Sequence, residues 1–542
     1  MANPTSPTQR FDAIVVGAGF AGMYMLIKLR ELGFTSRVIE AGTDVGGTWY
    51  WNRYPGARCD VESLDYQYSF SEELQREWNW SERYATQPEI LRYAGFVADK
   101  FDLRRDIQFR TRVTSARWDD DTARWTIGTD NGDRFEAKFF IAGTGCLSAA
   151  STPQFAGLET FQGPTYHTGR WPHEGVNFTG KRVAVIGTGS SGIQSIPIIA
   201  EQASHLYVFQ RTPNFSLPAA NHLLSPEKVD RYRDNFAAIK AEARKSRSGI
   251  VIKAPDKSVF DVPVEERQRE FSERWVQGGF QMMQAYKDLV VTNEANEVVA
   301  EFVRSKIRET VADPEVAEEL SPRDHPLGTK RICIDTDYYR TYNRSNVTLV
   351  NIRKHPIDGM TPRGVKTVDA EYEVDAIVFA TGFDAMTGAL FAMNIEGKGG
   401  LRLNDKWAAG PRTYLGLATA GFPNLFTITG PGSPSVFSNM IVSIEQHVDW
   451  ISACMAYMRA HGLDTVEADV AAEDAWVEHV NQLASMTLYP QANSWYLGAN
   501  IPGKPRVFMP YAGGVGTYRE KCDQVVAAGY AGFSFRANAV RR

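Results

Sequence analysis

The stretch FDAIVVGAGFAGMYMLIKLRELG, residues 11–33, decides the fold of this 542-residue chain. A continuous apolar run with β-branched residues, typical of a parallel strand covered on both faces, leads into Gly17, Gly19 and Gly22. The following residues carry apolar side chains at helical spacing, and Gly33 stands where a helix end favours a left-handed residue. Strand, glycine turn and helix in this order predict a dinucleotide-binding Rossmann unit.

Each residue of this first fingerprint has an expected task. Gly17 makes the tight turn, Gly19 lets a pyrophosphate approach the backbone, and Gly22 lets helix and strand pack closely. The next predicted strand, SRVIE, ends in Glu40. A carboxylate there accepts hydrogen bonds from an adenosine ribose and repels a 2′-phosphate, which favours FAD or NAD over NADP.

A second unit repeats this order further along the chain. KRVAVI leads into Gly187, Gly189 and Gly192 of GTGSSG, and the next predicted strand, HLYVFQRT, carries Arg211 where the first unit has an acid. An arginine offers a fork of donors for a phosphate, so this half predicts an NADPH site with Arg211 and Thr212 on the 2′-phosphate. The alternative is a surface arginine at a strand end.

Composition excludes several classes of function. The 59 Lys and Arg are interspersed with 64 Asp and Glu, for a formal net charge of −5, and no basic run with interleaved aromatics predicts a nucleic-acid partner. The five cysteines form no C-x-x-C pair, and the nine histidines show no metal-ligand spacing, so we expect neither a redox disulfide nor a metal site.

The opening segment MANPTSPTQR lacks the basic-then-apolar order of a signal peptide, and no apolar stretch is long enough to span a membrane. We therefore expect a cytoplasmic protein without a membrane partner. The sequence leaves its oligomeric state open.

The order of motifs predicts an α/β fold with two Rossmann-like dinucleotide-binding domains, for FAD and NADP, the second inserted in the first and itself carrying an inserted helical subdomain. The expected boundaries are 1–145 for the first part of the FAD domain, 146–224 for the first part of the NADP domain with a connector at 161–172, 225–325 for the helical subdomain, 326–374 for the rest of the NADP domain, and 375–542 for the rest of the FAD domain.

Four further motifs show what the chain resembles. FQGPTYHTGRWP at 161–172, GGTWYWNRYPGARCD at 46–60, TKR at 329–331 and ATGFD at 380–384 match the patterns of the type I Baeyer–Villiger monooxygenases. Within that family the chain looks similar to the phenylacetone and steroid monooxygenases. The resemblance covers essentially the whole chain and implies an enzyme that uses FAD, NADPH and O2 to convert ketones to esters or lactones through a C4a-peroxyflavin and a tetrahedral adduct.

The resemblance also assigns catalytic residues. Such a reaction needs the negatively charged, nucleophilic form of the oxygen adduct, and a guanidinium stays charged at any relevant pH. Arg331 is the expected cation, with Asp60 as the carboxylate that pairs with it and positions it, while Lys330 joins Arg211 and Thr212 at the 2′-phosphate. The alternative for Arg331 is a structural ion pair with Asp335 or Asp337.

Other residues are expected near the cofactors or the substrate. Gly47 and Trp49 lie in the motif expected at the flavin, although Trp49 is equally typical of a core aromatic, and Trp495 matches a family position in a mobile segment near 490–510 that closes over substrate and nicotinamide. His167 sits in the connector, where coupling of domain motion to cofactor position is the expected task rather than base catalysis. The remaining residues expected to line the substrate pocket are Leu147, Val436, Phe437 and Met440.

The ketone is expected to be aromatic, cyclic or steroid-like. Two other functions fit the same motifs. One is a flavin-dependent N- or S-oxygenase, which keeps its oxygen adduct protonated, and the other is a noncatalytic NADPH-binding redox module.

Overall fold

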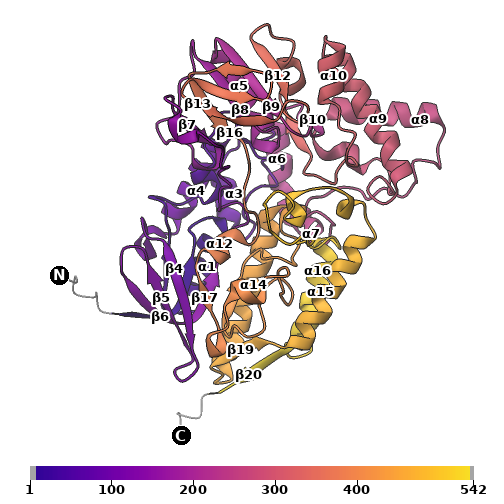
Figure 1. The fold of residues 1–542 in the computed structure, drawn as a ribbon. Helices are drawn as coiled ribbons and strands as arrows, with labels where there is room; N and C mark the ends of the chain where they lie inside the picture. The colour runs from indigo at the N-terminus through magenta and orange to yellow at the C-terminus, as the bar shows by residue number, and fades with distance from the viewer. Residues whose placement is uncertain (1–7, 538–542) are drawn as a thin grey trace.

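The computed structural model describes residues 8–537, so most of the opening segment discussed above lies outside the described residues. Two sheets organise these residues: one of eight strands and one of five. In Figure 1 the five-stranded sheet is at the top, the eight-stranded sheet at the lower left, and the C-terminal helices at the lower right. The predicted pair of dinucleotide-binding folds is confirmed.

The eight-stranded sheet contains the first fingerprint. Its strand β1 lies between β2 and β6 and pairs with both in parallel, and Gly33 ends α1 with a φ of 70°. The elements of this unit are β1 (Gln9–Val16), α1 (Phe20–Glu31), β2 (Ser36–Ile39), β3 (Ile107–Gln108), β4 (Val113–Asp119), β5 (Arg124–Thr129), β6 (Arg134–Ala142), β17 (Ile395–Glu396) and β18 (Leu425–Thr427). Three helices follow the first βαβ unit: α2 (Thr48–Trp51), α3 (Glu72–Glu77) and α4 (Gln87–Lys100).

The five-stranded sheet contains the second fingerprint and is parallel throughout. Its strands, in spatial order, are β12 (Val347–Asn351), β9 (His205–Gln210), β8 (Arg182–Ile186), β16 (Ala376–Phe379) and β7 (Thr165–His167), and the glycine turn leads into α5 (Ser190–Gln202). Beside it lie α11 (Tyr338–Thr341), the pair β10 (Ser216–Pro218) and β11 (Cys333–Asp335), and the small antiparallel sheet of β13 (Ile357–Thr361), β14 (Gly364–Thr367) and β15 (Glu371–Glu373).

One predicted boundary is wrong. We expected the chain to return to the first domain at residue 375, but β16 pairs with β8 and β7 in the five-stranded sheet. The sequence AIVF is apolar enough to sit in the middle of either sheet, so its composition gives no sign of its partner. The return to the eight-stranded sheet therefore comes after Phe379.

The charged stretch predicted as one helical subdomain divides into two groups of helices. The first, α6 (Pro226–Asp234) and α7 (Phe236–Ala243), lies on the first domain, where the Tyr232 hydroxyl donates to Asp65 Oδ1 at 2.7 Å and Lys240 Nζ donates to the Asp65 carbonyl at 3.0 Å. The second comprises α8 (Val264–Gln277), α9 (Asn293–Thr310) and α10 (Pro314–Leu320), which lie beside the five-stranded sheet in Figure 1.

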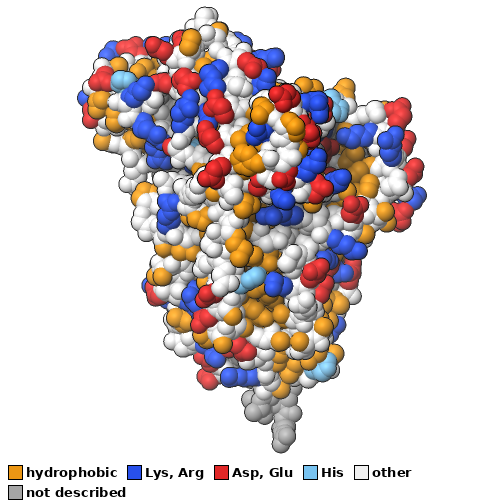
Figure 2. Space-filling view, turned by 90° about the vertical axis from the view of Figure 1, so that its right-hand side faces the viewer, with side chains coloured by type: hydrophobic (Ala, Val, Ile, Leu, Met, Phe, Trp, Pro, Cys, Tyr) orange, Lys and Arg blue, Asp and Glu red, His pale blue; other side chains and the backbone are white. Residues whose placement is uncertain are grey.

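Charges on this second group are paired with each other. Arg304 bonds to Glu297 and Glu301 on the same helix, and Arg308 links Glu301 to Glu318 of α10. Figure 2, which shows the face that carries these helices, has basic and acidic side chains intermixed. No part of this face presents a large area of one sign.

The C-terminal region completes the first domain. Helix α14 (Met440–Ala460) packs against α1, and it begins after Asn439, whose side chain accepts from the Ile441 amide at 3.1 Å. The remaining elements are α12 (Gly388–Phe391), α13 (Leu403–Lys406), β19 (Thr465–Ala468), α15 (Val470–Ser485), α16 (Val515–Ala527) and β20 (Phe533–Arg536). Between residues 8 and 537, no helix combines the length and the apolar composition that crossing a bilayer requires.

Candidate active site

Arg331 and Asp60 are 271 residues apart in the sequence and form an ion pair between the two domains. The guanidinium donates to Asp60 Oδ2 from Nε at 2.9 Å and from Nη2 at 2.5 Å. Asp60 is the last residue of the 46–60 motif in the first domain, and Arg331 lies just before β11 in the second. The expected pair is therefore brought together, and it lies where the two domains meet.

The guanidinium is fixed by three further groups. Nη1 donates to the Val436 carbonyl at 2.6 Å, the ring of Phe280 lies 5.5 Å from Cζ, and the hydroxyl of Tyr496 also interacts with the guanidinium. Sequence reasoning missed Phe280 and Tyr496, because nothing in the order of motifs places residue 280 or 496 beside residue 331.

The two acids considered as alternative partners of Arg331 are engaged elsewhere. The carboxylate of Asp335 accepts from the Ser216 hydroxyl and from the Tyr338 amide, and Asp337 pairs with Arg340 at 3.5 Å. Arg331 therefore forms no ion pair with Asp335 or Asp337 and pairs with Asp60 instead.

The electrostatics of the pair favour a permanent cation. Burial would lower the pKa of Arg331, but the charge of Asp60 outweighs this effect and raises that pKa above its ordinary value. About a quarter of each side chain is exposed, so the pair borders accessible space. A charged, oriented guanidinium in partly dry surroundings can stabilise a negative oxygen.

The first glycine turn has the form of a pyrophosphate cradle. A Cβ on Gly47 would lie 2.8 Å from the Cα of Gly19, so the two glycines face each other at close range. A Cβ on Gly22 would lie 1.8 Å from the Gly17 carbonyl oxygen, which confirms close packing of helix on strand. Trp49 is buried, and its indole donates to the Tyr66 hydroxyl at 3.0 Å.

Glu40 stands at the end of β2, next to this turn. Its two carboxylate oxygens accept from the amides of Ala18 at 2.7 Å and Gly42 at 2.6 Å. Burial raises the pKa of Glu40, and these two hydrogen bonds oppose that rise. The Trp51 side chain also donates to this carboxylate, and a carboxylate has about four lone-pair sites, so one is left to accept from a ribose hydroxyl.

The second turn has a cluster of cations beside it. Lys330 interacts electrostatically with both Arg211 and Arg353. Arg353 also donates to the Thr212 hydroxyl at 3.1 Å and pairs with Asp324 at 2.5 Å. Arg353 was not predicted from the sequence. Burial lowers the pKa of Lys330, and the charges of Arg211 and Arg353 lower it further. The charge of Asp324 acts in the opposite direction.

Arg353 could not be found without the strand order. It follows β12, and β12 is the neighbour of β9, after which Arg211 comes. Parallel strands end at the same edge of a sheet, so residues beyond β9 and β12 meet. The buried Nε2 of His325, next to Asp324, has no hydrogen-bond partner among residues 8–537.

The four residues expected to line the substrate pocket lie in one apolar cluster. Val436 is buried in it, and Leu147, Phe437 and Met440 pack against it from the side. Aromatic rings dominate the cluster: Phe437 stacks on Tyr489 with centroids 4.6 Å apart and meets the edge of Tyr496 at 4.7 Å. Since the Val436 carbonyl bonds to Arg331, this cluster adjoins the ion pair.

Trp495 is half-buried and lies at the edge of the same cluster, with its ring centroid 4.5 Å from that of Tyr496. Its segment is attached to the ATGFD motif: Asn500 donates to the Phe383 carbonyl at 2.8 Å, and Lys504 Nζ bonds to Asp384 Oδ1 at 2.5 Å.

His167 is held in a network of hydrogen bonds. Its Nδ1 accepts from the Gly169 amide at 2.9 Å, and its Nε2 lies 3.1 Å from the Ser151 carbonyl and 3.2 Å from the Thr381 hydroxyl. Because Nδ1 accepts, Nε2 carries the proton. Burial lowers the pKa of His167, so the neutral form is favoured, and the ring connects β7 to the segment after β16.

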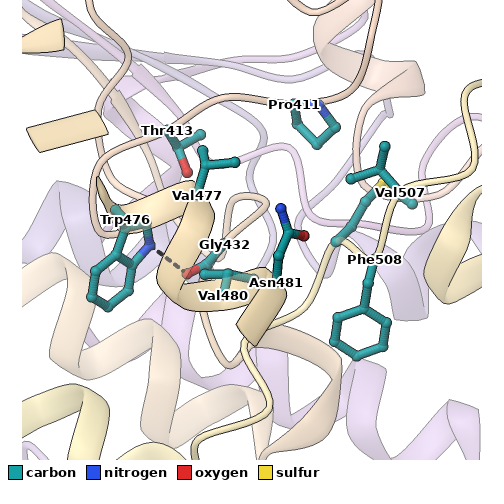
Figure 3. Close-up of a pocket in the computed structure, with 10 residues that line it drawn as sticks. Pro411, Thr413, Gly432, Trp476, Val477, Val480, Asn481, Val507 and Phe508 are labelled. Carbon is teal, nitrogen blue, oxygen red and sulfur yellow. Dashed lines mark hydrogen bonds between the residues drawn. The ribbon is translucent and has the colours of Figure 1, made fainter. Parts of the chain in front are cut away.

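The loop before α14 is held by hydrogen bonds to two other segments of the chain. Figure 3 shows the Trp476 indole donating to the Gly432 carbonyl, at 3.0 Å, beside a cavity of only about 20 Å³. The Gly432 amide also donates to the Met509 carbonyl at 2.7 Å. This cavity is too small for a ketone, and the contacts around it fix the loop that leads to Val436.

The cysteines give no sign of a redox disulfide. All five are buried and unpaired. Burial raises the pKa of Cys146 to about 11 and that of Cys333 to about 12, so both remain thiols near Arg331. No group of three or more His, Cys, Asp or Glu able to hold a metal occurs in the part of the chain that the structure describes.

Known proteins resemble this chain along almost its full length. The pyridine nucleotide-disulphide oxidoreductase family matches residues 14–277. A Baeyer–Villiger monooxygenase of Pseudooceanicola batsensis is 43% identical over 96% of this chain and 95% of its own, and a phenazine N-monooxygenase of Lysobacter antibioticus is 43% identical over 96% of each.

Among solved structures, an oxidised steroid monooxygenase bound to NADP is 53% identical, covers 98% of this chain and 100% of its own, and superimposes with a TM-score of 0.94. Identity at this level over the whole length goes beyond a shared fold, and it agrees with the motifs and the interdomain ion pair described above. The chain belongs to the Baeyer–Villiger monooxygenase family.

Proposed function

We propose that this protein binds FAD in its first domain and NADPH in its second, and that it inserts one oxygen atom of O2 beside a ketone carbonyl. In the overall reaction, ketone, O2, NADPH and a proton give an ester or lactone, NADP+ and water. The observation that carries the proposal is the guanidinium of Arg331, held by Asp60 where the two domains meet.

The residues present fit both cofactors. The lack of side chains at Gly19 and Gly47 lets the two backbones meet closely at the glycine turn where a pyrophosphate would bind, and Glu40 stands where the ribose would bind. At the second turn, Arg353 donates to Thr212 and lies near Lys330 and Arg211, with Asp324 as the near anion of the cluster, and an added phosphate dianion would balance these three cations. When bound, FAD would supply the activation of O2.

The protein's own contribution is orientation and charge. A guanidinium has five N–H groups, of which Asp60 and Val436 take three, and the Tyr496 hydroxyl also interacts with it. An N–H group outside these contacts can bind an anionic oxygen or the carbonyl oxygen of the ketone. Asp60 fixes the plane of the guanidinium, so the donors need not reorient during the reaction.

Oxygen transfer to a ketone is proposed in preference to N- or S-oxidation. A fixed cation favours the deprotonated, nucleophilic oxygen species over the protonated, electrophilic one. The aromatic cluster around Phe437, together with the resemblance to a steroid monooxygenase, supports a cyclic or aromatic ketone as substrate. The unpaired thiols support a cytoplasmic location.

A panel of substrates tests this proposal. Purified enzyme with FAD, NADPH and O2 would be given cyclohexanone, phenylacetone and progesterone, and in parallel thioanisole and phenazine. NADPH consumption and product identity would both be measured. We expect an ester or lactone from at least one ketone, at a yield that matches NADPH consumed. Oxidation of phenazine or thioanisole without any ester would refute the proposal, and so would peroxide released in proportion to NADPH with every compound.

A further inference from the structure

A groove of about 550 Å³ lies away from the proposed active site, between α4 and the end of the connector. One wall is a face of α4 that carries Pro88, Leu91 and Arg92, and the other is formed by Pro172 and His173. In Figure 1, α4 lies between the two sheets, so the groove spans the junction of the domains.

The groove is separated from the pyrophosphate cradle by the loop of residues 43–53. On one side of this loop, Gly47 faces Gly19; on the other, a Cβ on Gly46 would lie 2.6 Å from Leu91 Cδ1. The groove therefore opens on the face of the loop opposite the glycine turn. It is distinct from the sites assigned above to FAD and to NADPH.

Two guanidinium groups line this groove without a carboxylate partner. Arg53 donates from Nε to the Tyr50 carbonyl at 2.7 Å and lies over the Tyr50 ring at 5.0 Å. Arg92 is exposed. Neither side chain has a carboxylate within 4.0 Å among residues 8–537. Asp44 is the one carboxylate in the wall, and it forms an ion pair with Arg104 at 2.9 Å.

The remaining surroundings also favour an anion. Arg53 is partly buried, and burial lowers its pKa, an effect that Tyr50 and the more distant charge of Asp44 oppose. The N-terminus of the 14-residue helix α4 borders the groove through Gln87 and Pro88, and Thr86 provides no side-chain cap. The ring of His173 packs against that of Tyr50, with their centroids 4.8 Å apart. The neighbouring Glu174 is exposed.

We propose that this groove is a binding site for a small organic phosphate, with the phosphate on Arg53 and Arg92 and the organic part along Pro88, Leu91 and Pro172. A dianion matches two unpaired guanidinium groups better than a single carboxylate does. The volume of the groove exceeds what inorganic phosphate needs, and Pro88, Leu91 and Pro172 give part of its wall an apolar surface. Ligand binding would join the first domain to the connector.

Calorimetric titration of the flavin-loaded protein in low-salt chloride buffer tests the site. Saturating NADP+ would occupy the nucleotide site, and phenyl phosphate would be the probe, with phenylacetate and inorganic phosphate as comparisons. We expect phenyl phosphate to bind with a dissociation constant of about 1 mM or lower and at least tenfold more tightly than either comparison. Equal binding of phenylacetate, or no binding of phenyl phosphate, would overturn the proposal.

Matched variants locate the binding. The double variant Arg53→Gln/Arg92→Gln should bind phenyl phosphate at least tenfold more weakly. The double variant Arg134→Gln/Arg231→Gln, which removes two exposed arginines without ion pairs, has the same net charge and should bind like the wild type. If both double variants lose affinity equally, the groove is not the site. The single variant Arg92→Gln changes an exposed side chain only and should lose about threefold even if the double variant folds poorly.

Discussion

Arg331 is the single residue on which the proposed reaction depends most. It is charged, oriented by Asp60 and Val436, and adjacent to the aromatic cluster. The variant Arg331→Ala removes the charge, and we expect ester formation to fall at least about 100-fold. Reduction of the flavin by NADPH should stay within about threefold of wild type. Arg331 bonds to Asp60 and Val436, whereas the cations expected at the 2′-phosphate are Arg211, Lys330 and Arg353.

This prediction is checked by chromatography of the product and by stopped-flow absorbance of the flavin. Arg340→Ala is the matched control, since Arg340 is exposed and, among residues 8–537, forms an ion pair only with Asp337. Ester formation within tenfold of wild type in Arg331→Ala would remove Arg331 from the role assigned to it.

Asp335 permits a prediction about stability. Burial raises its pKa to about 6 from an ordinary value of 3.8, although hydrogen bonds from Ser216 and Tyr338 oppose the rise. The folded state thus binds this proton more tightly than the unfolded state. The stabilisation is complete below pH 3.8 and is lost as the pH rises through about 6. Two pKa units correspond to about 3 kcal/mol of unfolding free energy.

The neutral variant Asp335→Asn should therefore melt at a higher temperature than wild type at pH 8, with the difference shrinking towards pH 4. Thermal unfolding followed by circular dichroism at both pH values measures this change. As a control, Asp358→Asn changes an exposed carboxylate that pairs with Lys366, and it should alter the melting temperature little at either pH. An equal shift in melting temperature at pH 4 and pH 8 would contradict the assigned pKa.

The second glycine turn shows how one element serves both packing and binding. A Cβ on Gly192 would lie 2.3 Å from the Gly187 carbonyl oxygen, whereas one on Gly189 would meet no atom within 4 Å. Gly189 also has an extended backbone, with a φ of −83°, that any residue can adopt. The space at Gly189 is thus available to a ligand, and the space at Gly192 is needed by the chain.

The two alanine variants should separate these roles. We expect Gly192→Ala to lower the melting temperature by several degrees, as a cost of about 1–3 kcal/mol implies. Gly189→Ala should keep the melting temperature and raise the KM for NADPH at least about tenfold. Thermal unfolding and NADPH-dependent flavin reduction give the two readouts. A Gly189→Ala enzyme with unchanged KM would place the pyrophosphate elsewhere.

Contacts between distant parts of the chain join the domains. The side chain of Gln194 on α5 accepts from the Tyr54 hydroxyl at 2.8 Å and donates to the Arg58 carbonyl at 3.0 Å. It thereby holds the loop that leads to Asp60 against the second fingerprint. Lys504 likewise attaches the segment of Trp495 to Asp384 and to the Ala385 carbonyl.

Removal of the Lys504 charge should loosen that segment. Trypsin does not cut Lys504 in the wild type, because Pro505 follows it, so Arg506 is the relevant site in both proteins. We expect Lys504→Met to be cleaved after Arg506 several-fold faster, as local opening becomes easier. Mass spectrometry of timed digests measures the rate. Lys366→Met, which breaks an exposed pair with Asp358, is the control, and equal cleavage in all three proteins would refute the attachment.

Local sequence predicted both Rossmann units because their information is local. The glycines, the flanking apolar runs and the cap at Gly33 lie within about 25 residues of each other, and their effects on backbone and packing need no distant partner. The starts of α14 after Asn439 and of α6 after Ser225 are equally local, since each of these side chains accepts a hydrogen bond from an amide in the first turn of its own helix. The choice of Asp60 and Arg331 came from family motifs, not from local physics.

Tertiary structure decided what depends on which strands and loops are neighbours. The apolar run of β16 fits either sheet, and only pairing with β8 and β7 assigned it to the second. Arg353 joins Thr212 because β12 and β9 are adjacent, and Phe280 and Tyr496 reach Arg331 through long connections. Local propensity sets each element, but contacts between residues hundreds of positions apart follow from the packing of whole domains, which no short stretch of sequence contains.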